Sequence, residues 1–379
     1  MGTPGQEYWP KWGVGLLLLA SAWSSQAGLF DKLTGSGKPG FVELNDNTNQ
    51  ADAFKQAFSD TAVPEEIRPR KIAIGAFQIE FVTSHRGASD SGETKAEKTY
   101  TLKGITPVQM QNITEKMHRE FAALLTQRGY EVLPASVLQS TSFKTELAVP
   151  NEGPVVVDDT GSITDLANTA GLISQKGETH MASVTATAKG TAPNVFERKF
   201  LVLPVARNAA NEAGMAVMQV RLKLNFMQFD EGGGFGFAKI EGKPRNTLAS
   251  KDSRIEVFWP TSKSAQFALK VPVVLPGGVA EKITELDMST GEKAAVVAKG
   301  LFGAANSLLG FGASSNGGAA RFVAGSTMTQ VDTAASVGQT VYSAANSGKF
   351  EVTADPDYEE KVGKDLALVL QLYAQALPK

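Results

Sequence analysis

Nine consecutive residues, Met218–Phe226, alternate between apolar and polar side chains. A period of two suits a β-strand and does not suit a helix. We therefore expect a long antiparallel strand with one buried face and one wet face, followed by a turn at EGGGFG. The apolar members are Met218, Val220, Leu222, Leu224 and Phe226, and the polar members are Gln219, Arg221, Lys223 and Asn225.

A second apolar stretch, KIAIGAFQIEFV at residues 71–82, indicates a largely buried strand. Many such strands lead into a nucleotide-binding loop, but SHRGASDSGETKAEKTYTLK, which follows, lacks the glycine spacing of a phosphate-binding loop. We expect a hairpin or a mobile loop there, and no nucleotide site. Strand composition also marks HMASVTATAKG and VFERKFLVLPVA further along the chain.

Two segments have the pattern of amphipathic helices. In the first, Thr106 begins a capping box, Pro107 takes the first helical position and Gly129 provides the stop. In the second, near the C-terminus, Asp355 is the expected cap and Pro356 the first helical residue. Their expected buried faces are Met110, Ile113, Met117, Phe121, Leu124 and Leu125 in the first, and Tyr358, Val362, Leu366, Val369, Tyr373 and Leu377 in the second.

The N-terminus has the three parts of a signal peptide: Lys11, an apolar run at residues 14–22, and a small-residue exit ending at Ala27. The run is shorter than the ~20 residues that span a bilayer, although an uncleaved anchor is an alternative. We expect export to the periplasm of a Gram-negative cell. The chain has no cysteine, which excludes disulfides, thiol catalysis, cysteine metal sites and a lipid anchor on an N-terminal cysteine.

These patterns predict an α+β fold: a small α/β domain followed by an antiparallel β-rich region and a C-terminal helix. The expected parts are a signal peptide at 1–27, an extended arm at 28–66, the α/β domain at 67–142, the β-rich region at 143–289, a Gly/Ala/Ser-rich segment at 290–348, and a strand and helix at 349–379.

The Gly/Ala/Ser-rich segment has two interpretations. Its composition is that of a flexible insertion. However, it also carries more large apolar residues than a solvated linker needs, which favours contact with a membrane or a neighbouring subunit. The candidate interaction residues are Leu301, Phe302, Leu308, Leu309 and Phe311.

The segment VVVDDTGS resembles the active-site loop of aspartic proteases, in which two carboxylates share one proton. Asp159 would be the first carboxylate and Asp332, in QVDTAAS, the second. Ala334 replaces the glycine of the second motif, and Asp158 would crowd the first carboxylate. A hydrogen-bonded β-turn is therefore the favoured interpretation, and an aspartic-type peptidase the alternative.

Other chemistry has little support in the sequence. The three histidines, His85, His118 and His180, show no ligand spacing on a shared element, and we place His118 on the wet side of its helix. The nucleophile elbow G-x-S-x-G is missing. A net charge of −2 lacks the basic excess of nucleic-acid-binding proteins. We predict no catalytic residue, metal, cofactor or nucleic-acid partner.

Four segments in order resemble the periplasmic α/β domain of the curli secretion-channel family: KIAIGAF, LLTQRGYEVLPASVL, FDEGGGFGFAKI and ITELDMSTGEKAAVV. The resemblance covers about residues 71–300 and implies a strand, a helix and a short strand, followed by a later strand that closes on an S-T-G-E turn. Curli channels are lipoproteins, and without a cysteine this chain cannot share their anchor.

The leading hypothesis is an exported, non-enzymatic periplasmic component of a cell-envelope or secretion assembly. It would act by protein–protein contacts, through self-association or with other envelope proteins, with peripheral contact to the outer membrane as a further hypothesis. The expected contact surfaces are exposed sheet edges and the Gly/Ala/Ser-rich segment. The signal peptide, the missing catalytic set and the apolar residues near 300 motivate it. A soluble periplasmic ligand-binding module is the second alternative.

Overall fold

The structure is a computed structural model that describes residues 41–44, 49, 51–52, 57, 70–90, 95–158, 178–193, 199–234, 237–250, 252–261, 264–286 and 348–377. Contacts divide the chain into residues 1–40 and residues 41–379. All described residues belong to the second unit. The expected signal peptide lies outside them, as do the candidate interaction residues near 300.

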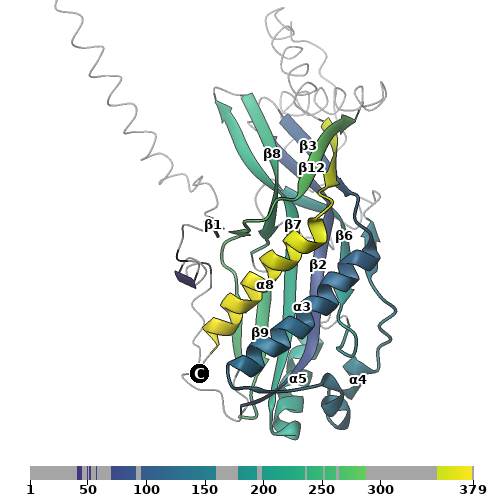
Figure 1. Cartoon of the computed structure of the whole chain (residues 1–379), viewed down its shortest axis with the longest axis vertical. Helices are drawn as coiled ribbons and strands as arrows, with labels where there is room; N and C mark the ends of the chain where they lie inside the picture. The colour runs from purple at the N-terminus through teal and green to yellow at the C-terminus, as the bar shows by residue number, and fades with distance from the viewer. Residues whose placement is uncertain are drawn as a thin grey trace, which may run out of the picture. The chain divides into compact units, whose positions relative to one another are not determined.

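The fold is mixed α/β and mostly strands, with one large curled sheet and a C-terminal helix (Figure 1). The strands are β1 (Val42–Glu43), β2 (Lys71–Asp90), β3 (Lys95–Lys103), β4 (Glu131–Leu133), β5 (Val155–Asp158), β6 (Glu178–Thr187), β7 (Ala216–Gly234), β8 (Phe237–Leu248), β9 (Arg254–Phe258), β10 (Ser264–Ala268), β11 (Val273–Val274), β12 (Ala280–Leu286) and β13 (Gly348–Ala354). The helices are α3 (Pro107–Gln127), η1 (Ala135–Ser140), α4 (Lys144–Leu147), α5 (Lys199–Ala213) and α8 (Tyr358–Ala376).

Strand β2 is the centre of the sheet. Its first half pairs in parallel with β4 on one side and β7 on the other, and its second half pairs antiparallel with β6 and β3. From there the sheet continues from β3 through β13 to β12, and from β6 to β5. The strand expected at residues 71–82 is therefore confirmed, and β2 with β3 forms the hairpin that was one of two expectations for the polar continuation.

A β-bulge at Gly75 explains the spacing of apolar residues along β2. The register with β7 shifts between Ile74 and Ala76, so that one extra residue is accommodated. Ile74 and Phe77 consequently share one face despite their odd separation, and Ala73 and Ala76 share the other. Glycine suits this position because it has no side chain: a Cβ at Gly75 would lie only 3.0 Å from the ring of Phe143, so the ring would have to shift.

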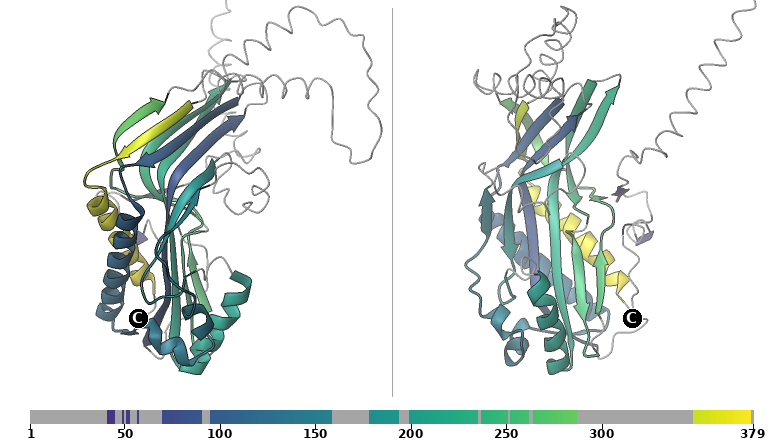
Figure 2. Two further views of the ribbon diagram at one scale, coloured as in Figure 1. Left: turned by 90° about the vertical axis from the view of Figure 1, so that its right-hand side faces the viewer. Right: turned by 180° about the vertical axis from the view of Figure 1, so that it is seen from behind.

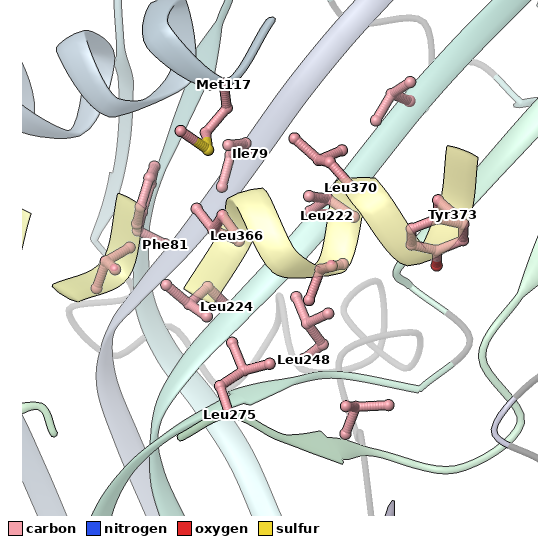
Figure 3. Packing of buried hydrophobic residues seen from close by; sticks show 14 of the residues in the cluster. Ile79, Phe81, Met117, Leu222, Leu224, Leu248, Leu275, Leu366, Leu370 and Tyr373 are labelled. Atoms are coloured by element: carbon pink, nitrogen blue, oxygen red, sulfur yellow. The ribbon is translucent and has the colours of Figure 1, made fainter. Parts of the chain in front are cut away.

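Helices α3 and α8 lie together on one face of the sheet, and α5 lies on the other (Figure 2). Figure 3 shows Leu366 and Leu370 of α8 among sheet residues such as Leu222. Burying such side chains contributes roughly 1.5–3 kcal/mol each. On the opposite face, a smaller cluster joins alanines of α5 to Leu138 of η1 and Phe143. VFERKFLVLPVA, which has strand composition, contains the start of α5, so that expectation was wrong for its helical part.

Both predicted helices exist, but only the first begins where expected. Thr106 caps α3, with its hydroxyl accepting from the Gln109 amide and the Gln109 side chain accepting from the Thr106 amide. Helix α8 begins at Tyr358, two residues later than predicted from Pro356, and Asp355 is not its N-cap. The carboxylate of Asp355 instead accepts hydrogen bonds from the Asp357 amide and the Lys361 ammonium.

The long strand expected at Met218–Phe226 is confirmed as β7, but its pairing and the burial of its polar side chains differ from the prediction. It runs parallel to β2 and antiparallel to β8 and β9, so its pairing is mixed. The polar residues Gln219, Lys223 and Asn225 are buried like their apolar neighbours. The predicted wet face is therefore wrong.

The β7–β8 hairpin packs closely against β2 and β3 through two glycines. A Cβ at Gly87 of β2 would lie 2.6 Å from Phe229 Cε1 of β7. Conversely, a Cβ at Gly242 of β8 would lie 2.6 Å from Tyr100 Cε2 of β3. The ring centroids of Tyr100 and Phe229 are 5.6 Å apart. Thus a glycine of β2 faces an aromatic ring of β7, and a glycine of β8 faces an aromatic ring of β3. Because glycine has no side chain, the β7–β8 hairpin can approach β2 and β3 closely.

Candidate functional site

Strand β5 ends the sheet on one side and is unusually apolar for an edge strand. Among the described strands it pairs only with β6. Its residues Val155, Val156 and Val157 are 53%, 58% and 50% exposed. Consecutive strand residues point to opposite faces, so both faces of β5 are open as well as its outer edge. Natural edge strands usually carry charges or proline that discourage pairing. In β5 these residue types are confined to the ends, with Pro154 just before the strand and Asp158 as its last residue, and the three valines between them offer neither.

Strand β12 ends the same sheet on the other side. The path runs β5, β6, β2, β3, β13 and β12, and among the described strands β12 pairs only with β13. Ile283 and Leu286 of β12 are the other exposed large apolar residues that lie at an end of this path. This path of the described sheet thus ends on each side in a strand that has exposed apolar residues and, among the described strands, a partner on one edge only, although β12 also carries the charged Lys282 and Glu285.

A pocket of about 310 Å³ lies where β4 and β6 separate along the edge of β2. After β6 ends, the loop that follows stays on this edge, because the amides of Ala188 and Ala192 donate to the carbonyls of Phe77 and Gly75. Ile74 contributes from β2 and Ala122 from α3. The remaining lining residues are His118, Val132, Leu133, Pro134, Ala135, Ser136, Lys189, Gly190 and Thr191.

His118 is half-buried in this pocket rather than on the wet side of its helix, which corrects the sequence prediction. Its ring lies 5.3 Å from the ring of Phe77. Burial lowers the pKa of His118, and the nearby Glu115 partly opposes this effect while Arg119 adds to it. The imidazole is therefore neutral at neutral pH and can donate one hydrogen bond and accept another.

A buried ionic cluster joins β2 to β7. Glu80 accepts from Arg221 Nη2 at 2.7 Å and lies 3.0 Å from Lys223 Nζ. The Lys223 side chain is fully buried, and Asp252 lies 3.9 Å from its ammonium. Burial alone would raise the pKa of Glu80, but Lys223 and Arg221 outweigh it and hold that pKa below the usual value. The cluster neutralises its own charges and has a structural role.

Two histidines meet although the sequence offered no shared element for them. His85 of β2 and His180 of β6 are register partners, both buried, with ring centroids 4.7 Å apart. Phe229 meets His85 edge-on at 4.8 Å. Burial, His85 and Lys223 together lower the pKa of His180 well below its usual value. Within the described residues no group of three or more potential metal ligands exists.

A buried carboxylate lies on α8. Asp365 accepts from the Gly277 amide at 3.1 Å and from Asn246 Nδ2 at 3.3 Å. Burial raises the pKa of Asp365 to about 6, although both hydrogen bonds act in the opposite direction. This carboxyl group therefore holds the loop at Gly277 and strand β8 to the helix.

Other sequence candidates lie outside the described residues: Asp159, Asp332 and the apolar set Leu301, Phe302, Leu308, Leu309 and Phe311. In the described part of the chain, no helix is both long and apolar enough to cross a membrane. Comparison with protein-family models, curated proteins and solved structures finds no match.

Sequence reasoning missed the pocket, and it included exposed sheet edges in the assembly hypothesis without locating them in the sequence. Pocket residues His118, Ser136 and Lys189 come from separate elements and have no mutual spacing that a pattern could reveal. In the sequence, the valines of β5 stand out only as the apolar run before Asp158 and Asp159. Their VVV run was a usable signal, since three adjacent β-branched residues favour a strand, but exposure depends on which strands lie beside it.

Proposed function

We propose that this protein is an exported, non-enzymatic periplasmic component of a cell-envelope or secretion assembly and that it acts by protein–protein contacts. The observation that carries the proposal is the exposed run Val155–Val157 on a strand that pairs along only one edge within the described part of the chain. Such an edge is a template for another strand, and burying apolar side chains there favours association. We also propose that the fold is of the α+β class, with a small α/β part before a β-rich part.

The partner we propose is a second copy of this chain, with β5 of one copy pairing with the β12 edge of the next. Ile283 and Leu286, three positions apart, place one exposed apolar side chain on each face of β12, beside the exposed charges of Lys282 and Glu285. Because β5 and β12 are different surfaces at opposite ends of one sheet path, their pairing is head-to-tail. Head-to-tail contacts form a ring if they close and a filament if they do not.

The test uses Val156→Lys and Ile283→Lys, each of which places a charge on one edge. We expect wild-type oligomers in size-exclusion chromatography with light scattering, and monomers for each variant alone. An equimolar mixture of the two variants keeps one intact β12 edge and one intact β5 edge, so it should give heterodimers. Val108→Lys is the matched control, because Val108 is 66% exposed on α3 and should leave assembly unchanged.

A monomeric wild type at all concentrations would reject the proposal. Loss of assembly in Val156→Lys alone, with Ile283→Lys unaffected, would instead show a symmetric β5–β5 contact. A variant lacking residues 295–320 tests the candidate interaction segment separately, and lipid vesicles added to both proteins test peripheral membrane contact. N-terminal sequencing of the exported protein tests cleavage before Gly28.

A further inference from the structure

We infer that the pocket between β4, α3 and the loop after β6 binds a small organic monocarboxylate. The ligand would place an aliphatic or aromatic body on the apolar wall and its carboxylate at the polar rim. This inference is independent of the proposed assembly. It rests on the lining of the pocket, on its polar side chains that have no hydrogen-bond partner among the described residues, and on the sign of their charge.

The wall of the pocket suits an apolar body. Ile74, Ala122, Val132 and Leu133 are buried or half-buried lining residues, drawn from β2, α3 and β4. The volume of about 310 Å³ is at the lower end of the range for small-molecule pockets. A body of a few carbon atoms would therefore gain hydrophobic contact on several sides.

Three polar side chains of the lining are available to a ligand. His118, Ser136 and Lys189 have no side-chain hydrogen bond or ion pair with the described part of the chain. Thr191 differs, because its hydroxyl accepts from the Phe77 amide and donates to the Ala188 carbonyl. The loop is thus held in place by Thr191 while its lysine remains at the rim.

The charge of these groups favours an anion. Lys189 is cationic, and the neutral imidazole of His118 and the hydroxyl of Ser136 can each donate. Of the described residues that line the pocket, none is an aspartate or glutamate. The nearby carboxylate of Glu115 accepts from the Lys189 amide and from Gln111 Nε2, each at 2.9 Å, and its negative charge at His118 is opposed by the positive charge of Arg119. A single cation beside an apolar wall matches one carboxylate better than a phosphate, which favours several donors and cations.

The experiment measures binding of sodium hexanoate and sodium benzoate to the full chain by isothermal titration calorimetry. Hexanol and benzyl alcohol serve as neutral counterparts of similar shape. We expect saturable binding of the acids and at least about tenfold weaker binding of the alcohols, because a charge-assisted hydrogen bond is lost. No saturable binding of either acid, or equal binding of acids and alcohols, would overturn the inference.

Two variants locate the site. Lys189→Gln changes an exposed side chain and should weaken acid binding by about tenfold while leaving alcohol binding unchanged. Ala122→Leu should fill the pocket and abolish binding of both. Lys144→Gln, at another exposed lysine, is the control and should bind like wild type. If Lys189→Gln binds the acids as tightly as wild type, the inference fails, whether or not Ala122→Leu folds.

Discussion

Lys223 Nζ of β7 lies 3.0 Å from Glu80 Oε1 of β2, with the lysine side chain fully buried and the glutamate nearly so. The two residues are also register partners in the parallel pairing of these strands. A buried charge without its partner is strongly destabilising, whereas an intact pair approximately balances the cost of leaving water. The pair therefore makes the correct alignment of β2 with β7 a condition of stability.

Glu80→Gln should lower the free energy of unfolding by about 3–5 kcal/mol, because Lys223 would stay buried with Asp252 3.9 Å away as its remaining carboxylate partner. Lys223→Met should cost less, since Glu80 keeps Arg221 at 2.7 Å. Urea unfolding measures both. Glu97→Gln, which breaks the exposed pair with Arg86, is the control and should change little. Equal losses for all three variants would contradict this assignment.

Gly87→Ala should destabilise the protein by about 1–3 kcal/mol, because the new methyl group would overlap Phe229 and Ile240 and push the β7–β8 hairpin away. Gly278→Ala is the matched control, since a Cβ there meets nothing within 4 Å. Thermal and urea unfolding compare the two. If adding Phe229→Leu to Gly87→Ala restores stability, the overlap with the ring is the cause of the loss. A Gly87→Ala protein as stable as Gly278→Ala would refute the prediction.

Asp365 should make the protein less stable as pH rises from about 4 to about 6. Its folded pKa of about 6 lies above the unfolded value, so the folded state binds more protons across that window. Above it the cost is constant, at about 2–3 kcal/mol. Asp365→Asn should remove this slope and stabilise the protein at pH 7.5, measured by urea unfolding at several pH values. A variant that is less stable than wild type at pH 7.5 would contradict the prediction.

His180 should make the protein less stable as pH falls, which is opposite to the effect of Asp365. Its folded pKa is lowered, so the unfolded state binds more protons below about pH 6.5 and stability falls as pH decreases. His180→Gln should reduce that loss by up to about 1.4 kcal/mol per pH unit. His118→Gln should have an effect of the same sign but smaller size, because the pKa of His118 is lowered less. Identical pH profiles for wild type and His180→Gln would rule out this role.

The ends of α3 could be predicted because they depend on local contacts. Thr106 and Gln109 satisfy each other's backbone amides within one turn, and Gly129 adopts a positive φ of 87° after the helix. The start of α8 could not be predicted in the same way. Asp355 has the right residue type for a cap, but Lys361 and the Asp357 amide engage its carboxylate.

By itself, the sequence determined that Met218–Phe226 is a strand and that α3 and α8 are amphipathic, because period and capping depend on residues a few positions apart. Only the tertiary structure decided that the polar side of that strand is buried. Glu80, the partner of Arg221, lies 141 positions away, and a local pattern carries no information about it. The same holds for the pocket and the open edges, since the elements brought side by side by folding decide which groups remain unpaired.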